Sequence, residues 1–313
     1  MWRGDQPVVS VLCPTYQHAP FIEDAIKGVL GQVTDFPFEL LIRDDGSSDG
    51  TGDIVRDYAD SYPQVIKAVI EPHNTWEHTS PGEVLRGMAT GEFLAFCEGD
   101  DYWIHPGKLA RQVGSLRRRG DAMVSFHDVV TVVDGVVDDV GGRRGDRREF
   151  KPRDVIGVLL GVSTLSMCYR REPEFPIDKR PRVPHGDVFL KAWLSRCGTT
   201  LREDDLLAAV YRVHPGGVVS GATPGKFLVD TLTSHTLAAD YFVRHGDLDI
   251  AEDLLALAAS AAVDNYAAMG VMPHRQVARS VGVPARIELR LRHRARNINW
   301  LREAYRKATW RNP

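Results

Sequence analysis

The sequence predicts an α/β fold in which a mostly parallel sheet is flanked by helices and followed by an all-helical C-terminal region. Between residues 8 and 120, short β-rich runs alternate with amphipathic helical stretches. From about residue 224 onward the pattern is helical, with no strand signal. The first part should therefore be Rossmann-like, and ligands of such sheets bind beyond the carboxyl ends of the strands.

The expected strands of this sheet are short apolar runs bounded by turn residues, at residues 8–13, 38–43, 65–70 and 92–97. Between them, apolar side chains recur at helical spacing over residues 21–30, 51–61 and 81–89. Pro20 stands at the start of the first of these helices, where a proline is tolerated. This alternation of strand and helix is typical of parallel strands.

In the middle of the chain we expect further strands of the sheet, followed by a surface loop. A strand is expected at residues 123–127 and a hairpin over residues 129–140, turning at Asp134-Gly135. Residues 141–148 (GGRRGDRR) are typical of a surface loop, either simply solvated or acting as a lid over an anionic substrate. The later expected elements are a helix at 187–196, a strand at 206–213 and helices at 227–244, 250–269 and 286–307. We therefore predict one domain over residues 1–222 and a helical region over residues 223–313.

Composition excludes several classes of protein. The 313 residues include 43% hydrophobic and 26% charged residues, the averages of a globular chain. The formal net charge of -3 argues against a generally basic surface that binds nucleic acid. The four cysteines lie far apart without a CxxC pair, which indicates buried thiols. Because no signal peptide and no bilayer-length apolar stretch is present, a cytoplasmic location is expected.

Carboxylates crowd the end of the fourth expected strand. Asp100 and Asp101 follow it directly, next to Glu98. Such packed negative charges repel each other and resist desolvation unless a cation lies nearby. A site for Mg²⁺ or Mn²⁺ is therefore one interpretation, and a solvent-exposed acidic turn is the other.

A second polar cluster, DDGSSDGT at residues 44–51, follows the second expected strand. A helix N-cap loop accounts for Ser48, Asp49 and Thr51. It accounts less well for Asp44 and Asp45, because an aspartate aimed at the crevice can accept a hydrogen bond from a base N–H. The sequence has neither GxGxxG nor GxxxxGK[ST], so a bound nucleotide would have its diphosphate held by a metal.

Taken together and in this order, several segments resemble the family 2 nucleotide-sugar glycosyltransferases, which have the GT-A fold. The segments are PTYQHAPFIEDAIKGVLGQ, FELLIRDDGSSDGT, GEFLAFCEGDDYW with Pro106, HGDVFLKAWL and AVYRVHPGGVVS. The resemblance covers about residues 7–220. It implies an inverting, metal-dependent enzyme that transfers a sugar from a nucleoside diphosphate, with UDP favoured, to an acceptor hydroxyl. Such enzymes build glycans, polysaccharides and glycoconjugates.

The resemblance also implies a nucleoside pocket. Pro14, Thr15 and Tyr16 would line it, with Tyr16 covering the base. The aspartate pair Asp44 and Asp45 would bind the nucleoside, and Asp45 would accept the N3 hydrogen of uracil. Because thymine shares that edge, UDP and dTDP donors both remain open.

For the metal and the chemistry, the resemblance implies four further roles. Asp101 would bind Mn²⁺ or Mg²⁺, and Asp100 the ribose or the metal shell. Glu98 stands where many relatives have aspartate, so we assign it no role. His214 resembles a late histidine that reaches the metal or diphosphate, with a structural histidine as the alternative. Asp187 matches the general base that activates the acceptor hydroxyl, although an ordinary helix N-cap fits it as well.

Two other functions are alternatives to this one. A catalytically silent sugar-nucleotide-binding scaffold or sensor would keep the fold without the chemistry. A nucleotidyltransferase needs a glycine-rich loop with a basic residue after the first strand, and CPTY at residues 13–16 offers none. The segment at residues 73–87 departs from many relatives, and one hypothesis for it places Arg86 near the diphosphate.

The last expected helix is basic and amphipathic, with arginines around an apolar stripe. Its stripe could pack on the preceding helices or on a second subunit in a homodimer. The alternative is that the helix lies on the anionic inner face of a membrane and brings the enzyme to a lipid-linked acceptor.

Overall fold

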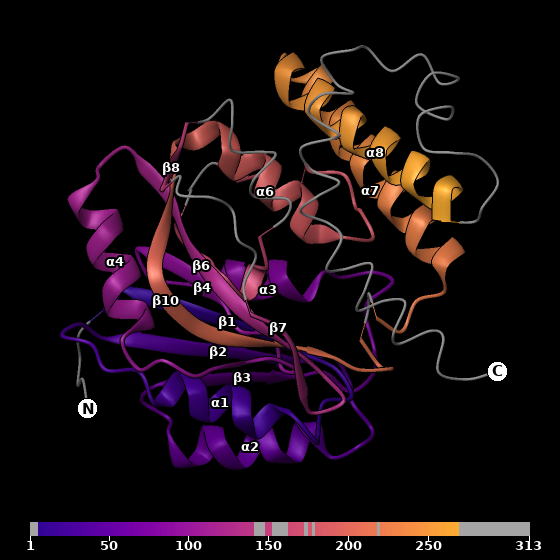
Figure 1. The fold of residues 1–313 in the computed structure, drawn as a ribbon. Coiled ribbons are helices and arrows are strands. Elements are labelled where there is room, and N and C mark those ends of the chain that lie inside the picture. The colour runs from indigo at the N-terminus through magenta and orange to yellow at the C-terminus, as the bar shows by residue number, and fades with distance from the viewer. Residues whose placement is uncertain are drawn as a thin grey trace. The chain divides into compact units, whose positions relative to one another are not determined.

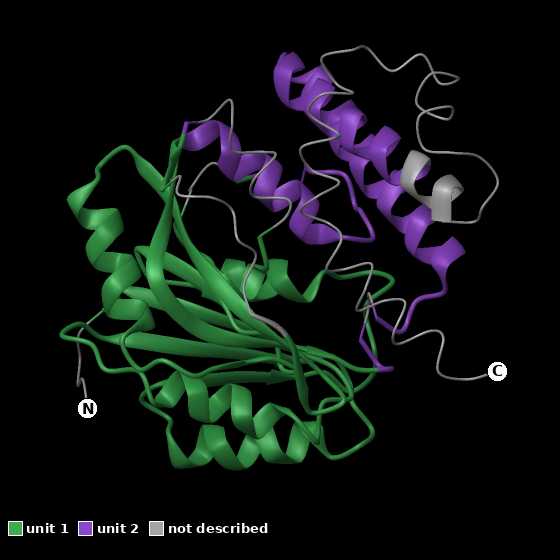
Figure 2. Ribbon diagram, viewed as in Figure 1, with its two compact units in different colours: residues 1–150, 162–175, 198–214 green, residues 151–161, 176–197, 215–313 purple. Residues whose placement is uncertain are grey.

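The computed structural model describes residues 6–140, 148–151, 162–171, 175–176, 179–217 and 220–268. The chain forms two compact units, shown in Figure 2. Unit 1 comprises residues 1–150, 162–175 and 198–214, and unit 2 comprises residues 151–161, 176–197 and 215–313. This division places the helix that carries Asp187 in unit 2, whereas the predicted boundary at residue 222 placed it with the sheet. The predicted helix at 286–307 and residues 141–147 of the predicted loop lie outside the described residues.

Unit 1 is built around one sheet with the strand order β3-β2-β1-β4-β9-β6-β10-β5, and β7 and β8 pair with β6 and β10. Its elements, most of which are labelled in Figure 1, are β1 (Val9–Thr15), α1 (Ile22–Leu30), β2 (Phe38–Asp44), α2 (Thr51–Ser61), β3 (Ile66–Ile70), α3 (Pro81–Met88), β4 (Phe93–Phe96), β5 (Tyr102–Trp103), α4 (Lys108–Arg118), β6 (Ala122–Val133), β7 (Val136–Val140), β8 (Glu149–Phe150), the short helix η1 (Thr164–Ser166), β9 (Cys168–Arg170) and β10 (Thr199–Val213). The predicted α/β fold, a mostly parallel sheet flanked by helices, is confirmed in its first half. Antiparallel strands, β9 among them, join it in the second half.

The central strands are buried because helices cover both faces of the sheet. β1 pairs in parallel with β2 on one side and with β4 on the other. α1 turns the side chains of Ile22, Ala25, Ile26 and Val29 into the core, as its apolar spacing predicts. In Figure 1, α1 and α2 lie together on one face of the sheet and α3 lies on the other. The chain therefore reverses direction across β1, and the crevice between β1 and β4 is where such a sheet binds ligands.

The strand register brings the polar segments to one edge. Thr15, the last residue of β1, lies opposite Asp44, the last residue of β2. Leu12 lies opposite Phe96, which ends β4 two residues before Glu98. Since these strands are parallel, the loops that follow them emerge side by side at the carboxyl edge.

Several elements were not predicted. α4 has a buried stripe of Leu109, Val113 and Leu116. The helix was not predicted because the arginines around these residues make the sequence pattern look polar. β10 begins at Thr199, whereas the sequence predicts a start at residue 206. The prediction was late because charged residues interrupt the alternation of apolar and polar side chains in the first half of the strand. The pairing of β10 with β6 shifts register between Arg202 and Leu207, and Asp205 there has φ +54°. A bulge of this kind breaks the period-2 pattern on which a sequence prediction depends.

Unit 2 contains the helices α6 (Gly186–Cys197), α7 (Pro224–Arg244) and α8 (Leu248–Ala268). The helical C-terminal part is thus present, with α7 and α8 at the predicted positions. α6 packs on α7 through aromatic rings, and the Phe189 and Phe242 rings stack at 5.5 Å. No helix in the described part of the chain is long and apolar enough to cross a bilayer. Cys13, Cys97 and Cys168 are buried, as predicted, and Cys197 is half-buried.

Candidate active site

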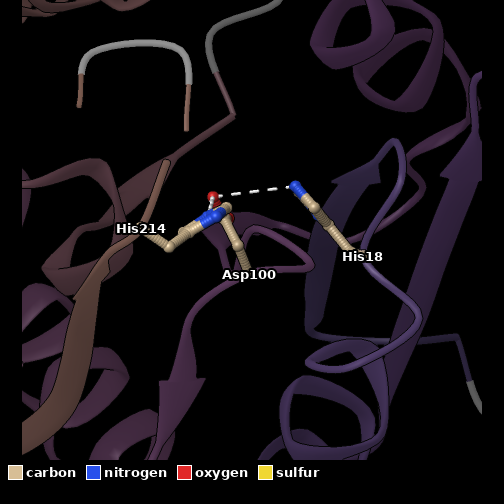
Figure 3. Close-up of side chains that lie close together, drawn as sticks. All are labelled: His18, Asp100 and His214. Carbon is tan, nitrogen blue, oxygen red and sulfur yellow. Dashed lines mark hydrogen bonds and ion pairs between the residues drawn. The ribbon is translucent and has the colours of Figure 1, made fainter. Parts of the chain in front are cut away.

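Three side chains from loops at the carboxyl edge of the sheet meet in unit 1. His18 follows β1, Asp100 follows β4 and His214 follows β10, and Figure 3 shows their polar ends turned toward one another. One potential ligand atom of each lies within 4.8 Å of the others. Asp100 Oδ2 is 3.2 Å from His214 Nε2 and 3.7 Å from His18 Nε2. A carboxylate and two imidazoles in this arrangement can hold a divalent cation.

The segment that carries His18 is held by Thr15 at the end of β1 and by Thr51 at the start of α2. Its backbone N–H donates to Thr51 Oγ1 at 2.9 Å, and its Nδ1 lies 3.2 Å from Thr15 Oγ1. Gln17, in the left-handed region at φ 57°, donates its N–H to Ser47 Oγ, which ties the β1 loop to the β2 loop. Burial lowers the pKa of His18 although the charge of Asp100 opposes the shift. The imidazole is therefore neutral near pH 7, which is the form that ligates metals.

Gly99 is required where the β4 turn approaches β1. A Cβ at this position would lie 2.7 Å from Thr15 Cβ and 3.0 Å from His18 Nδ1. Any side chain would therefore displace the His18 ring or the Thr15 side chain beside it.

We expect Gly99→Ala to weaken Mn²⁺ binding by about tenfold or more, since misplacing one ligand of a metal site typically costs 10–100-fold in affinity. Isothermal titration of the protein with MnCl₂ measures this. Gly87→Ala is the matched control, because a Cβ there meets nothing within 4 Å. Equal Mn²⁺ affinity in the two variants would show that the close approach at Gly99 does not shape the site.

The adjacent carboxylates Asp100 and Asp101 have different surroundings. Asp100 faces the two histidines, whose hydrogen bond and charges outweigh the effect of burial and hold its pKa below the ordinary value. Asp101 is 3% exposed, and its Oδ1 accepts the backbone N–H of Arg212 at 2.7 Å. Burial and the charges of Asp100 and Glu98 raise the pKa of Asp101 well above the ordinary value. The geometry thus brings Asp100, rather than the predicted Asp101, together with His214.

Asp45 is fixed by neighbours on β2 and on the loop after β3. Its Oδ1 accepts from the backbone N–H and hydroxyl of Thr75, at 3.2 and 2.7 Å, and lies 3.1 Å from Arg43 Nη1. Arg43, itself buried, also donates to Glu71. Asp45 Oδ2 is buried and has no hydrogen-bond partner among the described residues. This orphaned oxygen is an acceptor available to an N–H of a ligand.

The other predicted nucleoside residues lie at the same edge. Pro14 and Thr15 end β1, and Tyr16 follows them with 43% of its surface exposed, so that its ring is accessible to a base. Asp44 serves its own turn, because its carboxylate accepts from the N–H and hydroxyl of Ser47. Burial, only partly offset by these bonds, raises the pKa of Asp44. The structure thus brings Thr15, Tyr16 and Asp45 to one edge and gives Asp44 a local structural partner.

Asp187 lies in unit 2, in the first turn of α6. Its Oδ2 accepts from Lys191 Nζ at 2.7 Å, one turn further along the helix. Burial raises the pKa of Asp187, but the charge and hydrogen bond of Lys191 outweigh it, so that the net pKa lies below the ordinary value. The Asp187 side chain keeps 42% of its surface exposed, whereas that of Lys191 is buried. An ionised, accessible carboxylate is what a general base requires.

Sequence reasoning missed four residues of this region: His18, Arg43, Thr75 and Arg212. An arginine inside the apolar run of β2 is a readable signal for Arg43, because such a residue needs a buried carboxylate partner. The hypothesis for Arg86 finds no support, since this residue donates to the hydroxyl of Tyr169 and packs over an aromatic ring.

Comparison with known proteins shows which sequences are similar to this chain. The profile of Glycosyl transferase family 2 matches residues 10–171, which is more than half of the chain. An uncharacterized protein of Mycobacterium tuberculosis is 33% identical over 232 residues, and this match covers 74% of the chain and 66% of that relative's length. The glucosyltransferase WfgD of Escherichia coli, named for UDP-Glc and a diphosphoundecaprenol-linked GlcNAc, is 34% identical over 36% of the chain and 42% of its own length.

Solved structures agree on the fold. The structure of Staphylococcus aureus TarS 1–349 with UDP-GlcNAc is 20% identical with a TM-score of 0.57, over 96% of this chain and 90% of that one. The mannosyltransferase PcManGT of Pyrobaculum calidifontis, with GDP-Man and Mn²⁺, gives 20% identity and a TM-score of 0.55 over 99% and 89%. With the family profile covering most of the sheet and the GT-A fold confirmed, the chain belongs to glycosyl transferase family 2.

Proposed function

We propose that this chain transfers a sugar from a nucleoside diphosphate donor, with UDP favoured, to an acceptor hydroxyl, in a metal-dependent reaction with inversion. The observation that carries the proposal is the cluster of His18, Asp100 and His214 at the ligand-binding edge of the sheet. It lies in the same unit as Asp45, whose orphaned oxygen offers an acceptor to a base.

The cluster fits a divalent cation by the chemistry of its donors. Asp100 would supply an anionic oxygen, and His18 and His214 would each supply an imidazole nitrogen. Because a set with two nitrogens suits Mn²⁺ better than Mg²⁺, we favour Mn²⁺. When bound, the cation supplies Lewis-acid stabilisation for the negative charge that grows on the departing diphosphate. The related fold of a mannosyltransferase with Mn²⁺ supports this assignment.

Asp45 would recognise the base. Its Oδ2 would accept the N3 hydrogen of uracil or thymine, while Thr75 and Arg43 hold Oδ1. Tyr16 would lie over the ring. UDP-bound structures of the same fold support a uracil nucleotide, whereas the GDP-bound one shows that the fold also accepts guanine.

Asp45→Asn is expected to weaken UDP binding by about 10–100-fold, because a hydrogen bond to a charged group contributes about 1.5–3 kcal/mol. The amide group would present N–H donors or a weaker acceptor to the base. Titration calorimetry with UDP, dTDP and GDP in MnCl₂ measures the effect. The control is Asp60→Asn, an exposed carboxylate on α2. If Asp45→Asn lowered the affinity for all three nucleotides equally, Asp45 would not read the base edge.

Asp187 would take the proton of the acceptor hydroxyl. The Lys191 ion pair keeps its carboxylate ionised at neutral pH, as a base must be. With a base on the acceptor and the cation on the leaving group, one in-line displacement inverts the anomeric centre. This is the stereochemistry that the family resemblance implies.

A thermal-shift screen against nucleotide sugars with and without MnCl₂ tests the whole proposal. A true donor at 100 times its Kd adds about 2.7 kcal/mol to stability, so that its melting temperature should stand out from the panel. The best ligand is then incubated with the protein and MnCl₂, and release of nucleoside diphosphate is measured. Tight binding without release or transfer would instead indicate the silent sugar-nucleotide-binding protein.

A further inference from the structure

Arg212 on β10 contacts the turn that carries Asp100. Its backbone N–H donates to Asp101 Oδ1 at 2.7 Å, and its Nη1 donates to the carbonyl oxygen of Asp100 at 3.1 Å. The two bonds hold the turn after β4 from the side of β10. These bonds continue the pairing of β10 with β5, in which Val210 lies opposite Tyr102 just after the turn.

The same guanidinium reaches α1 and the rings around the cluster. It pairs with Asp24 on α1 and lies over the Tyr102 ring at 4.1 Å and the Phe21 ring at 5.3 Å. Phe21 in turn lies 4.8 Å from the His214 ring, measured between ring centres. Arg212 therefore contacts the turn that carries Asp100 and the segment that follows His18, and it lies two residues before His214 in the chain. Its side chain is only 17% exposed.

These contacts use what distinguishes arginine from lysine. A planar guanidinium can donate to a carbonyl, pair with a carboxylate and stack between rings at the same time. A lysine ammonium is a single point charge and can satisfy only part of this arrangement. The position therefore selects for the shape of the side chain as well as for its charge.

We propose that Arg212 is a positioning residue that sets the spacing of His18, Asp100 and His214, and through it the affinity for the divalent cation, without contacting the cation. The inference rests on the proposed function, because it takes the cluster to be the cation site. It predicts that loss of Arg212 weakens metal binding first and turnover as a consequence.

The test is Arg212→Lys, with Mn²⁺ binding measured by electron paramagnetic resonance of free Mn²⁺ in the absence of nucleotide. We expect Mn²⁺ affinity to fall about tenfold or more, in the range seen when residues that orient metal ligands are replaced. Turnover should recover at high MnCl₂, and the melting temperature of the metal-free protein should stay near that of the unaltered chain. Arg56→Lys is the control, since Arg56 forms an exposed pair with Asp53.

Asp24→Asn serves as a second, milder variant in case Arg212→Lys does not fold. It removes one partner of the guanidinium and leaves the bonds to the Asp100–Asp101 turn, so a smaller loss of Mn²⁺ affinity is expected. Unchanged Mn²⁺ affinity in Arg212→Lys, or in Asp24→Asn if the first does not fold, overturns the positioning role while the proposed function stands. Absence of Mn²⁺ binding in the unaltered protein overturns both.

Discussion

Asp100→Ala is expected to lower donor turnover by about a thousandfold or more, because metal stabilisation of a leaving group supplies several kcal/mol and 1.36 kcal/mol is a factor of ten in rate. The substitution removes the only anionic group of the candidate ligand set and leaves two imidazoles. Mn²⁺ affinity should fall with it. Both are measured on the same preparation, as kcat/KM for the donor and as Mn²⁺ Kd by calorimetry.

Asp101→Asn is the matched comparison, since it alters the neighbouring carboxylate. The amide oxygen can still accept the N–H of Arg212, and Asp101 is not a member of the cluster of His18, Asp100 and His214. We expect Mn²⁺ affinity within a few-fold of the unaltered chain. The opposite pattern, with Asp101→Asn losing Mn²⁺ and Asp100→Ala keeping it, would restore the ligand assignment made from sequence.

The different surroundings of these two aspartates show which part of the site could not be predicted from the sequence. The clustering of polar residues was predictable, because each polar segment follows a strand and parallel strands end at one edge. Adjacent residues in a turn point in different directions, and the choice between them is made by a partner from β10. That partner, the N–H of Arg212, lies 111 residues along the chain from Asp101. No local pattern encodes it.

His18 was missed for a related reason. It lies in the loop after β1, where Gln17 adopts a left-handed conformation and turns the chain toward Asp100. A glutamine does not predict this conformation, because glycine and asparagine are the residues that usually adopt it. The hydrogen bonds that stabilise it come from Ser47 and Thr51, on the loop and helix after β2.

The sequence holds a signal for the ion pair of Asp187 that the prediction did not use. A capping role and a catalytic role fit the first turn of a helix equally well, and that choice stayed open. Lys191, four residues further on, was a visible signal, because residues at this spacing lie on one helix face. The charge and hydrogen bond of Lys191 lower the pKa of the Asp187 carboxyl group.

Asp187→Asn is expected to keep Mn²⁺ and donor binding and to lower turnover by about 10²–10⁴-fold, the usual contribution of a general base. The amide oxygen still accepts from Lys191, so the helix should be little disturbed. Asp240→Asn is the control, because it also neutralises the acid of a pair spaced four residues apart in unit 2, with Arg244. Turnover near that of the unaltered chain would remove Asp187 from the base role.

The pH dependence of the reaction separates a base from a residue that only shapes the helix. Because Lys191 holds the Asp187 pKa below its ordinary value, protonation of Asp187 should not lower kcat/KM of the unaltered chain until the pH falls below the ordinary carboxylate range. The assay uses saturating MnCl₂, so that protonation of His18 and His214 does not limit the rate. Lys191→Met removes the lowering influence and leaves burial, which raises the pKa. Activity that needs the ionised carboxylate should then be lost at a higher pH. If both proteins lost activity at the same pH, a group other than Asp187 would limit the reaction at low pH.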